Sequence, residues 1–251
     1  PVLDKFILGK GAFLGYSPER EDPGNKNFNI ENTTKIVSGY TTNCRNLVDS
    51  FYRKITKKTF PTTTLKVAEM TKLYENIFRS INIGLVNEMK LALDKMGINI
   101  LEVINAAKTK PFGFMPFYPG PGLGGHCIPI DPFIMAWKAK QSGAETKFIE
   151  LSGKINRKMP IIIFKKVLYH LRNIKDPRIL ILGLSYKKNI DDARESPTFE
   201  LMKLFYDKKI KIDYHDEYFL KLPKMRNYDL KMNSVKINAY NLKKYNGVIV
   251  M

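Results

Sequence analysis

The chain is organised around one stretch of thirteen residues, Gly120-Pro121-Gly122-Leu123-Gly124-Gly125-His126-Cys127-Ile128-Pro129-Ile130-Asp131-Pro132. Five of its first six residues are Gly or Pro, so the backbone can adopt positive φ and approach a ligand closely. Asp131 and Pro132 before an apolar run predict a helix with Asp131 as its N-cap. The stretch therefore predicts a glycine-lined turn that presents Cys127 just ahead of a helix N-terminus, where the helix dipole favours a nucleophilic sulfur.

Length, composition and cysteine content limit what the chain can be. It has 251 residues, 44% hydrophobic and 12% aromatic, which is typical of a globular protein. No apolar run approaches the ~18 residues that cross a bilayer. The two cysteines, Cys44 and Cys127, and three scattered histidines predict neither a disulfide framework nor a metal site. A reduced, cytoplasmic setting is expected.

The formal net charge of +18 is compatible with binding to nucleic acid. The basic residues are spread along the chain, however, and no RNA- or DNA-binding motif accompanies them. A basic surface also suits a substrate that carries a diphosphate. The sequence therefore predicts a small-molecule partner rather than nucleic acid or a membrane.

Hydrophobic spacing predicts strands at 12–16 and 35–39, followed by a helix over 43–54. The longest periodic segment predicts a helix over 61–96, which Gly97 should end. Its buried face is expected to be formed by Leu65, Leu73, Ile77, Ile81, Leu85, Met89 and Ala92.

A mainly helical middle is expected to continue beyond Gly97. Asn99 should cap a helix that runs to Ala107. Two more helices are expected at 132–141 and 146–172, the second broken at Pro160.

The last part of the chain has a different character. A strand at 178–182, a helix at 197–207 and a strand at 210–215 predict a parallel crossover unit. The run from Asn246 to Met251 is a turn that leads into a strand, and Pro1 is no initiator methionine. The sequence is therefore expected to be part of a longer chain.

Five segments carry a resemblance to a known family. They are the cysteine stretch, Ala68–Asn76 (AEMTKLYEN), Ser17–Arg20 (SPER) and the loop segments Ser185–Lys188 and Asp191–Pro197. Together they resemble the nucleotide-sugar 6-dehydrogenases of the UDP-glucose/GDP-mannose dehydrogenase family. The His126-Cys127 pair is most similar to the branch that oxidises UDP-N-acetylhexosamines such as UDP-N-acetylglucosamine.

The resemblance implies an α/β fold with two nucleotide-binding, Rossmann-like domains joined by a central helical domain with one long helix. Residues 1–60 would be the remnant of an N-terminal NAD-binding domain, 61–173 the helical domain, and 174–251 an incomplete UDP-binding domain. The glycine fingerprint for NAD is missing from the chain. The loop before Cys127 offers only Lys108 and Lys110 where UDP-glucose enzymes carry an arginine.

The resemblance also implies catalytic roles. Cys127 would be the nucleophile, and Lys72 and Asn76 would hydrogen-bond the reacting oxygen of the substrate. Asp131 and Glu19 would steer the water that releases the product. On the residues alone, Lys72 and Asn76 are more typical of a solvated helix face, and Glu19 could equally be part of a charged turn. Asp131 could be a helix cap as well as a catalytic group.

Further residues would hold the ligands. Arg194 would contact the NAD cofactor. The expected contacts to the UDP-sugar are Tyr118, Gly120, Gly122, Leu123, Gly124, Tyr186 and Lys187.

The expected activity is an NAD-dependent, two-step oxidation of the C6 alcohol of a UDP-sugar to the uronic acid, through a thiohemiacetal and a thioester on Cys127. UDP-N-acetylglucosamine is the expected substrate, with UDP-glucose and UDP-N-acetylmannosamine as alternatives. A non-catalytic fragment that binds UDP-sugar or dimerises is the alternative of another class. A homodimer through the central helices is expected.

Overall fold

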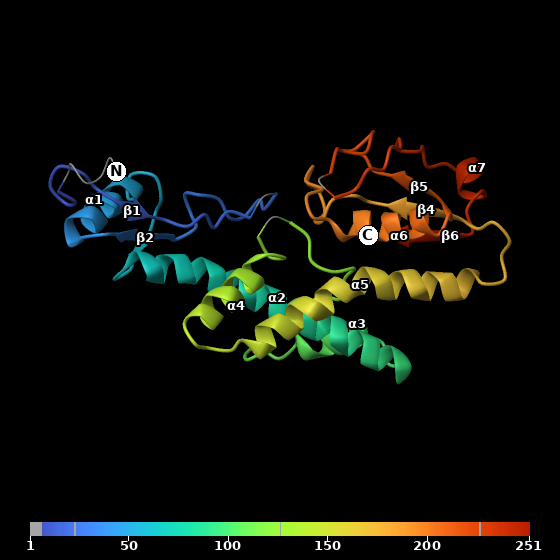
Figure 1. Cartoon of the computed structure of the whole chain (residues 1–251), viewed down its shortest axis with the longest axis horizontal. Helices are drawn as coiled ribbons and strands as arrows, with labels where there is room; N and C mark the ends of the chain where they lie inside the picture. Colours follow the sequence, from blue (N-terminus) through green and yellow to red (C-terminus); the bar gives the residue numbers. More distant parts are fainter. Residues whose placement is uncertain (1–6, 23, 126, 226) are drawn as a thin grey trace. The chain divides into compact units, whose positions relative to one another are not determined.

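The computed structural model describes residues 7–22, 24–125, 127–225 and 227–251, and has a mixed α/β fold (Figure 1). Two compact units divide the chain, Pro1–Asn76 and Ile77–Met251. The division falls within the longest helix, α2 (Leu65–Lys95), which has 31 residues.

The first unit contains a small mixed sheet with one crossover helix. Its elements are β1 (Gly15–Tyr16), β2 (Lys35–Gly39), α1 (Thr42–Tyr52) and β3 (Thr59–Pro61). The strand order is β1-β2-β3, and β2 pairs with β1 antiparallel and with β3 parallel. The observed β1 is shorter than the strand predicted over 12–16. The strand β3 was not predicted, because it has only three residues and ends in a proline.

In the second unit, α2 ends as predicted. Gly97 has φ +70° and the Ile98 N–H donates to the Leu93 carbonyl at 3.0 Å, so the last turn is closed by a glycine cap. Asn99 then caps α3 (Ile100–Ala107) by accepting from the Leu101 N–H at 3.0 Å.

The buried face predicted for α2 is wrong over its C-terminal half. Leu85 and Met89 are 54% and 41% exposed, whereas Ser80 and Asn87 are fully buried. The reason is a close helix–helix approach, since a Cβ added at Gly84 would lie 3.2 Å from the Cβ of Ser152. Small and polar residues make this contact, and a pattern of apolar residues does not reveal it.

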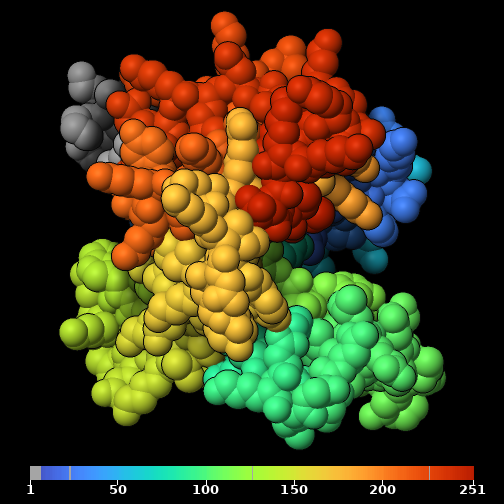
Figure 2. All heavy atoms as spheres, turned by 90° about the vertical axis from the view of Figure 1, so that its right-hand side faces the viewer, coloured from blue at the N-terminus to red at the C-terminus, as the bar shows by residue number. Residues whose placement is uncertain are grey.

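The helices α4 (Asp131–Gln141) and α5 (Lys147–Leu171) follow, and α5 corrects a second prediction. Pro160 lies inside α5 and does not break it. The flanking side chains of Met159 and Phe164 are buried, so tertiary packing holds the helix together despite the missing N–H. In Figure 2, α5 (yellow to amber) lies between the green helices of its unit and the orange-to-red region.

The last part of the second unit is a parallel three-stranded sheet. Its elements are β4 (Arg178–Leu182), α6 (Pro197–Asp207), β5 (Lys211–His215), α7 (Ala239–Leu242) and β6 (Gly247–Val250). The order is β5-β4-β6, with both pairs parallel. This confirms the predicted strand–helix–strand crossover, while the short α7 was not predicted.

Apolar side chains from α5, β4, α6 and β5 form one core beneath this sheet. Its fully buried members include Ile179 and Ile181 on β4, Phe205 on α6 and Tyr214 on β5, and Phe164 of α5 stacks edge-on against Phe205 with ring centroids 5.0 Å apart. Because α5 contributes to this core, the sheet and the preceding helix are packed as one body.

Candidate active site

The glycine turn before Cys127 is packed against the loop that follows β4. A Cβ added at Gly124 would lie 2.2 Å from the Cβ of Tyr186, and one at Gly125 would lie 3.1 Å from the Tyr186 ring. Gly125 also has φ +85°, which favours glycine. The structure thus brings together two predicted segments that are about sixty residues apart in the sequence, and the glycines allow that contact.

Two backbone groups hold the same turn. The Gly125 N–H donates to the Arg194 carbonyl at 3.1 Å. Gly122 lies against the Asn156 carbonyl, since a Cβ added at Gly122 would be 3.1 Å from the carbonyl oxygen. That carbonyl would normally accept from the N–H four residues later, but Pro160 has none, so the proline in α5 leaves the carbonyl available to face the turn.

A substitution in the turn tests this packing. We expect Gly124→Ala to lower the free energy of unfolding by roughly 1–3 kcal/mol, because the added methyl group must displace Tyr186. Gly120→Ala is the matched control, since nothing lies within 4 Å of a Cβ at Gly120. Thermal or urea unfolding of both variants measures the difference. Equal stability of the two would contradict the packing described here.

Cys127 lies four residues before the start of α4, and its side chain is exposed. The Cys127 carbonyl accepts from the N–H groups of Ile130 and Asp131, both at 2.9 Å, and this turn leads into the helix. Asp131 is therefore the first residue of α4, and the predicted N-cap is wrong: Ile130 occupies that position without a side-chain hydrogen bond. His126 lies outside the described residues.

Arg194 is close to this thiol. Its guanidinium is paired with Asp192 at 2.7 Å, and this hydrogen bond, with the charge of Asp192 and smaller contributions from Tyr186 and Cys127, raises the pKa of Arg194 above its ordinary value. Arg194 thus presents a fixed positive charge in the neighbourhood of Cys127.

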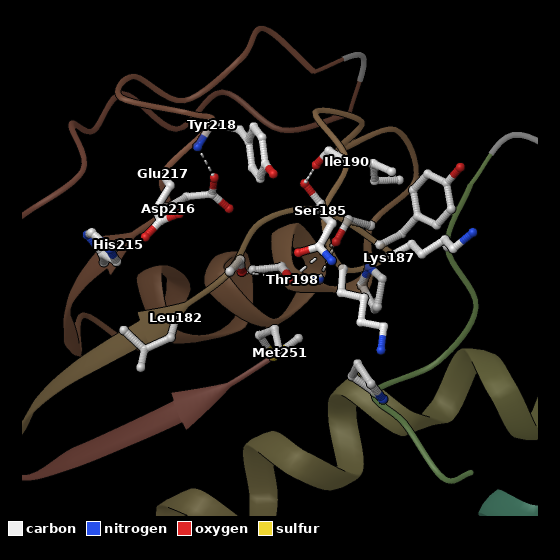
Figure 3. Close-up of a pocket in the computed structure, with 18 of the residues that line it drawn as sticks. Leu182, Ser185, Lys187, Ile190, Thr198, His215, Asp216, Glu217, Tyr218 and Met251 are labelled. Carbon is white, nitrogen blue, oxygen red and sulfur yellow. Dashed lines mark hydrogen bonds between the residues drawn. The ribbon is translucent and has the colours of Figure 1, made fainter. Parts of the chain in front are cut away.

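A cavity of about 470 Å³ opens at the carboxyl ends of the parallel strands (Figure 3). The strand β4 has β5 on one side and β6 on the other, so this edge is the position at which parallel α/β sheets bind ligands. The loop after β4 contributes Ser185, Tyr186 and Lys187 to the lining, and the glycine turn contributes Gly122 and Gly124. The cavity therefore borders the turn that carries the thiol.

A buried carboxylate orders the loops around this cavity. Asp216, 7% exposed, accepts from the N–H of Leu184 at 2.7 Å and from the N–H of Tyr218 at 2.8 Å. It therefore joins the loop after β4 to the loop after β5. Figure 3 shows the hydrogen bond between Asp216 and Tyr218 within the loop after β5. Lys187 and Lys188 add two cationic side chains to the lining, which suits an anionic ligand.

Lys72, Asn76 and Glu19 belong to the first unit. Lys72 and Asn76 lie one turn apart on α2, and Asn76 is only 5% exposed, so a fully solvated polar face is excluded for that residue. The loop that carries Glu19 reaches the same helix, because Arg20 pairs with Glu75 of α2 at 2.7 Å.

Glu19 is fixed by hydrogen bonds within its own loop. Its carboxylate accepts from the N–H groups of Arg20 and Glu21, both at 2.7 Å, and from Lys35 at 3.1 Å. Partial burial raises the pKa of Glu19, but these hydrogen bonds outweigh that effect and lower it below its ordinary value. Glu19 is therefore an ionised acceptor at neutral pH.

The remaining predicted ligand contacts are placed as follows. Tyr118 is 50% exposed, Gly120 donates its N–H to the side chain of Asn87 at 2.9 Å, and Leu123 lines a second cavity of about 260 Å³. Sequence reasoning missed Asn87 and Asn156, both almost fully buried. The available signal was an asparagine at a helix position where an apolar residue is usual.

The first unit contains part of what a dinucleotide site needs. The strand β2 ends at Gly39 and α1 begins at Thr42. Gly39 permits a close approach of the strand end to α1, since a Cβ there would be 2.1 Å from the backbone nitrogen of Arg45. No Gly-x-Gly-x-x-Gly turn joins a strand to a helix among the described residues. These residues fit only a portion of such a site. In the same described part of the chain, no group of three or more potential metal ligands is found and no helix is both long and apolar enough to span a membrane.

The fold and the site together define a mixed α/β protein whose exposed thiol lies on a turn beside a cavity at the carboxyl edge of a parallel sheet. The central-domain model of the UDP-glucose/GDP-mannose dehydrogenase family matches residues 66–158, and its UDP-binding-domain model matches residues 180–251. The chain belongs to the UDP-glucose/GDP-mannose dehydrogenase family.

Named relatives are similar along most of this chain. UDP-N-acetyl-D-glucosamine 6-dehydrogenase of Pseudomonas aeruginosa is 35% identical over 238 residues, which are 92% of this chain and 56% of that protein. UDP-N-acetyl-D-mannosamine dehydrogenase of Methanococcus vannielii is 30% identical, over 94% of this chain and 53% of that protein. The structure of UDP-D-ManNAc dehydrogenase from Pyrococcus horikoshii superposes with a TM-score of 0.85 at 28% identity. The superposition covers 99% of this chain and 57% of that one. The chain thus spans about half the length of the curated relatives it matches.

Proposed function

We propose that the protein to which this chain belongs oxidises the C6 alcohol of a UDP-sugar to the uronic acid in two steps, with Cys127 as the covalent nucleophile. The observation that carries the proposal is the contact of the thiol-bearing glycine turn with Tyr186 and Arg194 at the border of the cavity. This arrangement would place a sugar next to the sulfur while its diphosphate lies near Lys187 and Lys188.

The chain's own residues would serve the reaction as follows. The alcohol loses a hydride and a proton to give the aldehyde, and the Cys127 thiolate adds to its carbon, forming a C–S bond and an oxyanion. Lys72 and Asn76 would donate hydrogen bonds to that oxygen. Loss of a second hydride leaves the thioester. Water, steered by Asp131 and Glu19, would attack it, break the C–S bond and release the acid.

NAD is the proposed cofactor, and two NAD molecules bound in turn would each accept one of the two hydrides that leave C6. Arg194 is the residue of this chain proposed to contact it. This role stands on the family resemblance, because the described residues fit only part of a dinucleotide site.

The proposed organisation is that of two nucleotide-binding α/β domains joined by a central helical domain. The first is represented by residues 1–60, the helical domain by 61–173, and the UDP-binding domain by 174–251. A cytoplasmic location is proposed because the two cysteines of the sequence do not form the framework of a disulfide-stabilised protein.

A homodimer is proposed through the central helices. Leu85 and Met89 of α2, Val103 of α3 and the segment that includes Phe114 and Met115 line an apolar cavity of about 590 Å³. Each of these side chains is at least 40% exposed, which favours burial against a second copy.

UDP-N-acetylglucosamine is the proposed substrate, on the similarity to the Pseudomonas aeruginosa enzyme. The mannosamine-named relatives favour UDP-N-acetylmannosamine as the second candidate. Assays of the complete natural protein with NAD and each of these sugars or UDP-glucose decide between them. We expect two NADH per uronate, and fastest turnover with the glucosamine substrate. Absence of NAD reduction with every UDP-sugar, together with retained UDP-sugar binding, would replace the proposal with a binding protein.

A further inference from the structure

Two buried asparagines join the glycine turn to both long helices of the second unit. The Gly120 N–H donates to Asn87 Oδ1 at 2.9 Å, and Asn87 Nδ2 donates to Asn156 Oδ1 at 3.0 Å. Asn156 Nδ2 in turn donates to the Ser80 carbonyl at 2.9 Å. The three bonds therefore run in one direction, from the start of the turn to Asn87 on α2, then to Asn156 on α5, and back to Ser80 on α2.

Burial makes this relay of side-chain amides strong and sensitive to change. Asn87 and Asn156 are 0% and 2% exposed. In such surroundings a chain of hydrogen bonds in which every group is paired is stronger than in water. An amide left without its partner instead costs the full free energy of its desolvation. Each amide therefore has one favourable orientation, and that orientation sets where the Gly120 N–H lies.

Asn156 contacts the turn a second time through its backbone carbonyl, which lies against Gly122. The relay and this contact fix the beginning of the turn, and the Gly125 N–H bond to the Arg194 carbonyl fixes its end. Between Gly120 and Gly125 the glycines supply no side chains that could restrain the backbone. Apart from Pro121, which restricts its own φ, restraint at the glycines therefore comes from these external contacts.

We infer that Asn87 and Asn156 are positioning residues, which set the place of Cys127 through the backbone of the glycine turn without contacting the substrate. The inference rests on the proposed function, because it assigns a purpose to the position of the thiol. A shift of the turn by about 1 Å can lower the rate of a positioned reaction by ~100-fold. Substrate binding should change little, since neither asparagine lines the cavity of about 470 Å³. Asn87 also lies outside the second cavity, of about 260 Å³, which Asn156 lines together with Leu123, so Asn87→Leu gives the cleaner test of KM.

The test compares Asn87→Leu and Asn156→Leu with Leu93→Ala in the complete natural protein. Leu93 is 7% exposed in the core between α2 and α3, so its truncation lowers stability without touching the relay. Asn87→Ser, in which water can fill the space left by the amide, serves if a leucine variant does not fold. Thermal unfolding matches the variants for stability.

Two measurements are made on each variant. Hydrogen exchange read by mass spectrometry should be about tenfold faster across residues 120–125 in the relay variants than in Leu93→Ala. Steady-state kinetics should show kcat for uronate lowered by ~10- to 100-fold with KM for the UDP-sugar within about twofold of the parent.

The outcomes separate this inference from the proposed function. If the parent forms no uronate, the proposed function fails, while hydrogen exchange still tests whether the relay holds the turn. If the parent is active and the relay variants match Leu93→Ala in both exchange and kcat, the asparagines only stabilise the fold and the inference is overturned. Faster exchange with unchanged kcat overturns it as well.

Discussion

Replacing Cys127 with alanine is expected to abolish uronate formation, by about 10⁴-fold or more, as the loss of a covalent nucleophile does in other enzymes. Without the sulfur, the aldehyde made in the first step loses the group proposed to capture it and present its carbon for a second oxidation. Uronate and NADH measured together by chromatography and absorbance check the result. A trapped aldehyde in place of the acid would locate the loss at the second step.

Cys44 provides the matched control, as the other cysteine of the chain. It is buried, and its Sγ accepts from the Leu14 N–H at 3.4 Å and from Thr41 Oγ1 at 3.2 Å. Cys44→Ser keeps a hydrogen-bond acceptor there and should retain most of the activity. Alkylation with iodoacetamide should likewise react at exposed Cys127 and stop turnover. Uronate formation by Cys127→Ala at the parental rate would refute the proposed mechanism.

Replacing Lys72 with methionine is expected to lower kcat by ~10²- to 10³-fold, the usual loss when one donor to a reacting oxyanion is removed. Methionine keeps the length and the apolar stem of lysine but removes the ammonium group, so helix α2 should remain folded. Steady-state kinetics with the UDP-sugar measure kcat and KM separately. A selective loss of kcat indicates an interaction made in the transition state.

Lys66→Met is the matched control for this variant. Lys66 lies six residues earlier on α2, on another face, and is exposed. Its substitution should leave kcat within about twofold of the parent, in line with the small effects of exposed substitutions. If the two methionine variants behave alike, Lys72 has no role beyond that of a surface charge.

Local signals in the sequence were sufficient for most elements. The strand 178–182 and the helix 197–207 appear with the predicted bounds, because an apolar run and a Ser196-Pro197 helix start are each contained within a few residues. The side chain of Ser196 accepts from the Thr198 N–H at 3.3 Å, as a helix cap should. The end of α2 at Gly97 was predictable for the same reason.

Two of the failures share one physical cause, which is that tertiary contacts override local preference. Pro160 stays inside α5 because buried neighbours on both sides hold the helix. The face of α2 that carries Leu85 and Met89 is exposed because small residues make the contact with α5. The predicted cap at Asp131 failed for a local reason: its N–H donates to the Cys127 carbonyl four residues earlier, so Asp131 already belongs to the helix.

The sequence by itself determined the class of fold, the glycine-rich turn with its cysteine, and the residue types from which a site can be built, since each of these depends on neighbours along the chain. Only the tertiary structure decided that Tyr186 fills the space left open by Gly124 and Gly125, and that Asn87 and Asn156 reach the turn. Those contacts join residues between about thirty and seventy positions apart, and no local pattern of side chains encodes which distant groups will meet when the core closes.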